Sequence, residues 1–122
     1  MSIARDLAAF VTQVRYADIP PQALEHAAML ISSTVASAAC GTVITSSKIM
    51  RALAIERGGT PDASIWFDSG GRLPVASAAQ VNAVMSDAAA SDDSDLRNIV
   101  HAGTPLVSTS LAIAERTGAS GQ

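Results

Sequence analysis

The segment from Pro21 to Gly41 most restricts the folds open to this chain, because it is long, apolar and almost free of charge. Proline can open a helix but not continue one, and glycine commonly ends one, so these two residues predict the bounds of a single helix. Apolar side chains recur between them at helical spacing: Leu24, Ala27, Ile31, Val35 and Ala38. Since no charged residue follows His26 within the segment, we expect this helix to be central and largely buried.

The remaining segments also favour helices. Their periodicity and their breaks predict four more: residues 3–16, the segment from a Ser47 N-cap to Gly58, the segment from Val75 into the acidic residues after it, and the segment from Thr104 to Gly118. "ASIWFD" resembles a strand, and "SGGRLP" behind it predicts a turn. The predicted fold class is therefore all-α, with at most one short strand or hairpin around residues 63–74, as part of a larger helical domain.

Composition limits how stable such a domain is. A chain of 122 residues suits one domain, and 48% hydrophobic residues can supply its core. Very few residues are aromatic, so the core must consist mainly of small and aliphatic side chains, each of which buries little area. We therefore expect the chain to associate, either with a second copy of itself or with a complementary C-terminal segment.

Charge and motifs argue against several classes of function. A net charge of -3 with scattered basic residues does not suit nucleic-acid binding. Ser, Thr and Gly interrupt the uncharged run 27–47, which favours buried helix and loop over a membrane span. "MSIARDLAAF" does not resemble a signal peptide, so a cytoplasmic location is expected, with Cys40 as a buried, inert thiol. The two histidines are too far apart to suggest a metal site.

The polar stretch "SDDSDLRNIVHAG", residues 91–103, is the strongest candidate for a functional site. It gathers Asp92, Asp93, Asp95, Arg97 and His101. In one interpretation the aspartates cap turns beyond a helix end, and Asp95 and Arg97 form an ordinary surface pair. In the other, the paired aspartates and the histidine converge on a pocket where a proton is moved, since histidine and carboxylate are a common acid and base pair. The first amides of the helix at Thr104 would then help to bind a substrate carboxylate.

Three segments in collinear order carry a resemblance to a known family. "YADIPPQALEHAAMLISSTVASAACG" is similar to the opening of the 2-methylcitrate dehydratase family (MmgE/PrpD), where a "Y-x-D-[IL]-P" turn precedes a long apolar helix. "GGRLPVASAAQVNAVMSDAAASDDS" is similar to the family's "A-A-x-x-N" helix and the "D-F-D-D-T" box that follows it. "VHAGTPLVSTSLAIAE" resembles the helix introduced by "H-P-[SG]". The resemblance covers nearly the whole chain.

The resemblance implies an all-helical domain of which residues 1–122 form the N-terminal portion, the remainder of the family domain being absent from this chain. It implies lyase or isomerase chemistry beside a carboxylate: dehydration, decarboxylation or epimerisation of a small di- or tricarboxylic acid, without a cofactor. Family chains are several times longer, so the isolated chain is expected to be inactive.

Taken residue by residue, the resemblance implies two kinds of site residue and no metal ligand. His101, Asp92 and Asp93 match the histidine and the paired aspartates and are expected to be catalytic. Ser94 and Asn82 match the hydroxyl residue of the box and the helix asparagine and are expected to bind substrate.

Several positions depart from the family pattern. Ala90 stands where the box begins with Asp, Ser91 replaces Phe, Asp87 stands where many members have His, Ser33 replaces an Asp and Ala102 replaces Pro. Loss of the leading aspartate supports an alternative hypothesis. In that alternative the chain is a non-catalytic helical interaction module, or a relic, that requires a partner chain.

Overall fold

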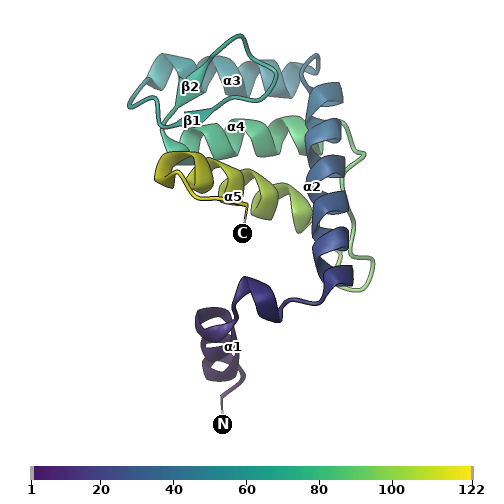
Figure 1. Ribbon diagram of the computed structural model, residues 1–122. Helices are drawn as coiled ribbons and strands as arrows, with labels where there is room; N and C mark the ends of the chain where they lie inside the picture. Colours follow the sequence, from purple (N-terminus) through teal and green to yellow (C-terminus); the bar gives the residue numbers. More distant parts are fainter. Residues whose placement is uncertain (1, 122) are drawn as a thin grey trace.

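The computed structural model describes residues 2–121 and is built mainly from helices (Figure 1). The helices are α1 (Ile3–Gln13), α2 (Pro21–Gly41), α3 (Thr45–Arg57), α4 (Val75–Ala88) and α5 (Gly103–Thr117), with a 3-10 helix, η1, at Tyr16–Asp18. Strands β1 (Ala63–Ser64) and β2 (Arg72–Leu73) pair antiparallel, with Ala63 opposite Leu73. The predicted mainly helical fold with one hairpin at residues 63–74 is confirmed.

Helix α4 lies at the centre of the fold. It packs against α2, α3, α5 and the hairpin, and Figure 1 shows α2 crossing the ends of α3, α4 and α5. The side chains that meet there are small: the core includes Ala38, Ala54, Ala63, Ala78 and Val81. Small side chains let helix backbones approach closely, but each removes little apolar surface from water.

Helix α2 is buried only where it crosses α4. The prediction that it is largely buried is wrong, because only Thr34, Ser37, Ala38 and Gly41 are buried, all in its C-terminal half. A Cβ at Gly41 would overlap the backbone carbonyl of Met85, so glycine permits the close crossing of α2 and α4. Among helices of the described residues, α2 alone is long and apolar enough to cross a membrane, judged by length and composition.

The N-terminal helix α1 stands apart from the rest. None of its residues is buried, and Figure 1 shows it separated from the α3–α5 layers. Its apolar side chains are exposed, including Ile3 at 87% and Phe10 at 64%. Within this chain the helix therefore has an apolar face without a packing surface.

Several local predictions need correction. The first helix ends at Gln13 and not at residue 16, because Val14 already has extended backbone. Ser47 is not an N-cap: Ile44 holds that position, and Ser47 is a buried residue inside α3. Cys40 is exposed, so the prediction of a buried thiol is wrong.

Candidate functional site

The loop between α4 and α5 folds back and brings Asp92 against His101. One carboxylate oxygen of Asp92 lies 3.2 Å from His101 Nδ1, and the Asp92 side chain is only 2% exposed. The same oxygen accepts a 2.8 Å hydrogen bond from the Thr104 hydroxyl at the start of α5. A buried carboxylate requires such partners, because burying it unpaired is costly. Asp92 and His101 therefore form a pair fixed to a helix end.

The contacts of His101 determine which ring nitrogen carries the proton. Besides Asp92, Nδ1 lies 2.9 Å from the backbone carbonyl of Asp93, and that oxygen can only accept. A carboxylate also only accepts when ionised, so Nδ1 donates and Nε2 is left with its lone pair in the neutral ring. The side chain is 52% exposed, and Nε2 has no partner among residues 2–121. Nε2 is therefore available to accept a proton.

Asp93 has a different position from its neighbour. Both of its carboxylate oxygens accept from the backbone N–H of Gly103, at 2.9 and 3.0 Å. Gly103 is the first residue of α5, so Asp93 satisfies a helix N-terminus from across the loop. A Cβ at Gly103 would overlap this carboxylate. The Asp93 side chain thus holds the first amide of α5, which we expected a substrate carboxylate to occupy.

Ser94 and the loop tip complete the surroundings of the histidine. Ser94 Oγ lies 3.4 Å from His101 Nδ1, a long contact. Both residues line a cavity of about 100 Å³ with Asp95, Leu96, Ile99 and Val100. Leu96 and Ile99 are each 88% exposed, so apolar side chains border the histidine on the outside of the molecule.

Asp95 organises the turn at the loop tip. Its carboxylate accepts from Asn98 Nδ2 at 2.6 Å and from the Arg97 amide at 2.9 Å, and these bonds, the Asn98 side chain foremost, lower the pKa of Asp95. The expected Asp95–Arg97 surface ion pair does not form, since Arg97 contributes only its amide among the contacts of this carboxylate. The carboxylates of Asp95 and Asp93 thus cap backbone amides, as in the turn-capping interpretation, whereas the Asp92 carboxylate contacts His101.

Asn82 lies elsewhere in the structure. It is 1% exposed on α4, and its amide bridges the hairpin segment. Oδ1 accepts from the Trp66 amide and Nδ2 donates to the Ser64 carbonyl, both at 3.0 Å. The structure does not bring this side chain to the Asp92–His101 pair, and its contacts describe a residue that fixes β1 to α4.

Sequence reasoning missed a set of buried hydroxyl residues beneath the pair. Ser37 Oγ lies 2.7 Å from the Ser86 carbonyl and 2.9 Å from Ser91 Oγ, which joins α2 to the start of the acidic loop. Ser86 Oγ donates to the Thr34 carbonyl at 3.1 Å. The signal was present, since these hydroxyls fall on the apolar faces of two predicted helices. A polar residue on such a face needs a buried partner.

No group of three or more His, Cys, Asp or Glu side chains that could hold a metal ion occurs within the described part of the chain.

The comparisons with known proteins gave one finding. The model of the MmgE/PrpD N-terminal domain matches residues 5–122. No curated protein and no solved structure gives a significant match. The match covers nearly the whole chain and includes the α4–α5 loop, so the chain belongs to the MmgE/PrpD family, in its N-terminal domain.

Proposed function

We propose that this chain is the N-terminal part of a dehydratase-type lyase that moves a proton on the carbon beside a carboxylate of a small di- or tricarboxylic acid. The observation that carries the proposal is the pairing of His101 Nδ1 with the buried Asp92 carboxylate, which leaves Nε2 free and exposed. Family membership supports the reaction class. The geometry supports the assignment of roles within it.

In this mechanism Nε2 of His101 accepts the proton from the carbon beside the substrate carboxylate. The electron pair left on carbon then forms a double bond as the C–O bond on the next carbon breaks, and the departing hydroxyl takes a proton from solvent and leaves as water, which is a dehydration. The imidazolium carries positive charge, and the Asp92 carboxylate at 3.2 Å stabilises it while fixing the ring orientation. In this proposal Ser94, which lines the same cavity as His101, hydrogen-bonds substrate.

Asp93 acts differently in this proposal from Asp92. Because its carboxylate is committed to the Gly103 amide, it holds the start of α5, and thereby Thr104, in position. It is a positioning residue. The substrate carboxylates must be bound by groups outside this cluster, since no cation of the described residues is paired with it except His101 itself.

The test replaces His101 with Gln in the full-length protein and follows exchange of the substrate's alpha proton in heavy water. We expect the exchange rate to fall by about a hundredfold or more, as is typical when a general base is removed. His26→Gln is the matched control, because His26 is an exposed histidine on the opposite half of α2 from the packed residues. An H101Q protein that exchanges at the wild-type rate would contradict the proposal.

A second candidate function is favoured by one observation. Ala90, which occupies the position where the family box begins with aspartate, adopts a left-handed backbone (φ 51°) and has no carboxylate to offer. If wild-type protein shows no exchange, we propose instead a non-catalytic helical module that binds a partner chain. Ala90→Asp then discriminates, because gain of exchange in that variant would identify the missing carboxylate as the cause.

A further inference from the structure

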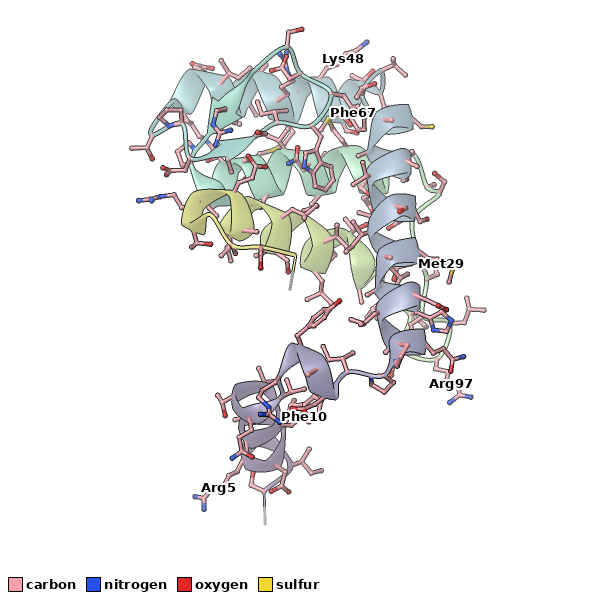
Figure 2. All side chains as sticks on the ribbon, viewed as in Figure 1. Arg5, Phe10, Met29, Lys48, Phe67 and Arg97 are labelled. Carbon is pink, nitrogen blue, oxygen red and sulfur yellow. The ribbon has the colours of Figure 1, made fainter. Side chains whose placement is uncertain are left out.

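A second cavity lies where α2 ends and α3 begins, and the loop between β1 and β2 forms part of its lining. It has a volume of about 380 Å³ and is lined by Thr42, Ser47, Lys48, Arg51, Trp66, Phe67, Asp68 and Met85. None of these residues belongs to the Asp92–His101 cluster. Figure 2 labels Lys48 and Phe67 at this corner, whereas Arg97 of the acidic loop lies toward the other end of α2.

The charges around this cavity do not cancel. Arg51 donates a 2.7 Å hydrogen bond to Asp68. This hydrogen bond lowers the pKa of Asp68 and outweighs desolvation, which raises it. Asp68 is therefore ionised at neutral pH and balances one cation. Lys48, the only lysine of the chain, forms no ion pair within residues 2–121 and extends from α3 at the rim. The lining thus carries one positive charge in excess.

One buried donor of the cavity lining has no partner. Ser47 lines it at 1% exposure, and its buried hydroxyl has no hydrogen-bond partner in the described structure. Ser47 belongs to the first turn of α3, a helix that starts at Thr45 without a side-chain cap. An orphaned buried hydroxyl is costly unless something accepts from it.

The rest of the lining is apolar and aromatic. Trp66 packs against the core, and Phe67, which has a left-handed backbone (φ 57°), also lines the cavity. A bare phosphate would leave most of this volume unused and would bring two negative charges to one excess positive charge. A carboxylate attached to a compact apolar body matches the excess charge, the free hydroxyl and the walls together.

We propose that this cavity binds a small monocarboxylate, with its anionic group between Lys48, Arg51 and the Ser47 hydroxyl and its apolar body against Trp66 and Phe67. The site is separate from the His101 pair, and the proposal does not depend on the reaction assigned there.

The experiment uses the chain's single tryptophan as the reporter, because Trp66 lines the cavity. Cyclohexanecarboxylate is titrated at constant ionic strength while tryptophan emission is recorded, with cyclohexanecarboxamide as the uncharged probe of equal shape. We expect a saturable change with the carboxylate and none with the amide. An equal response to both probes, or no saturation, overturns the proposal.

Two substitutions then test the assigned donors. Lys48→Met is expected to weaken binding about tenfold, the usual size for loss of one charge-assisted interaction, and Ser47→Ala to weaken it less. Arg57→Met is the matched control, because Arg57 lies at the far end of α3 and outside the cavity lining. Lys48 is exposed, so its variant is expected to fold, and wild-type affinity in K48M would contradict the proposal.

Amide chemical shifts provide a readout that does not depend on the tryptophan. We expect shifts on titration to concentrate at Ser47, Lys48 and the Trp66 indole. Shifts confined to residues around His101 would place the carboxylate at the other centre and overturn the assignment to this cavity.

Discussion

The adjacent aspartates of the acidic loop have separable tasks because their side chains contact different partners. Asp92 is turned toward His101 and Thr104, and Asp93 toward the amide of Gly103. The first contact orients a base, while the second completes a helix end. Substitutions at the two positions should therefore affect different measurements.

At Asp93 we predict a loss of stability. Asp93→Ala removes the acceptor of the first α5 amide, and loss of such a cap costs about 1 kcal/mol of unfolding free energy. Chemical denaturation of the purified chain measures it. Asp87→Ala is the control, since Asp87 is exposed near the C-terminal end of α4, where a negative charge opposes the helix dipole. Equal destabilisation by both substitutions would show that Asp93 does not cap α5.

At the scale of elements, the helices and the hairpin were predictable because their signals are local. Pro21 and Gly41 bound α2 as expected, and a pair of glycines precedes each strand of the hairpin. The Asp92–His101 contact was foreseen through the family pattern and the short loop between them. The fixed tautomer was not, because it depends on the Asp93 carbonyl and thus on loop conformation. Burial of α2 was overestimated, since an apolar composition does not reveal how many neighbours a helix has.

The close crossing of α2 over α4 predicts that a larger side chain at Gly41 lowers stability. Gly41→Ala would place a Cβ against the carbonyl of Met85, which belongs to a helix backbone and cannot move without disturbing α4. We expect a cost of roughly 3 kcal/mol, the upper part of the range for overpacking.

The matched control for this crossing is Ala36→Gly on an exposed position of α2, where only helix propensity is lost, about 1 kcal/mol. Thermal and urea unfolding of both variants provide the comparison. Alanine is the better helix former, so a Gly41→Ala protein as stable as wild type would mean that the two helices do not approach as closely as the structure shows.

At the scale of the whole molecule, apolar side chains are distributed unusually. The largest side chains with almost no exposure are Val81, Asn82, Thr34, Ser47, Ser86 and Ser108, most of which are polar. Meanwhile larger apolar residues of α1 and the acidic loop are exposed, among them Leu7 and Leu96. A core of small residues supplies little burial energy, and exposed apolar faces favour association. Because of these two features, we propose that the chain is a component of a larger assembly.

A variant that lacks residues 1–15, which include α1 and end just before η1, tests whether α1 mediates this association. Because no residue of α1 is buried, its removal should change the unfolding free energy of a dilute monomer by less than about 0.5 kcal/mol. The same deletion should abolish concentration-dependent association, since α1 carries the exposed apolar face of Ile3, Leu7 and Phe10. Light scattering over a concentration series, with denaturation at each concentration, measures both effects. A full chain that remains monomeric throughout would contradict association through α1, and a deletion that destabilises the monomer would show that α1 packs within its own chain.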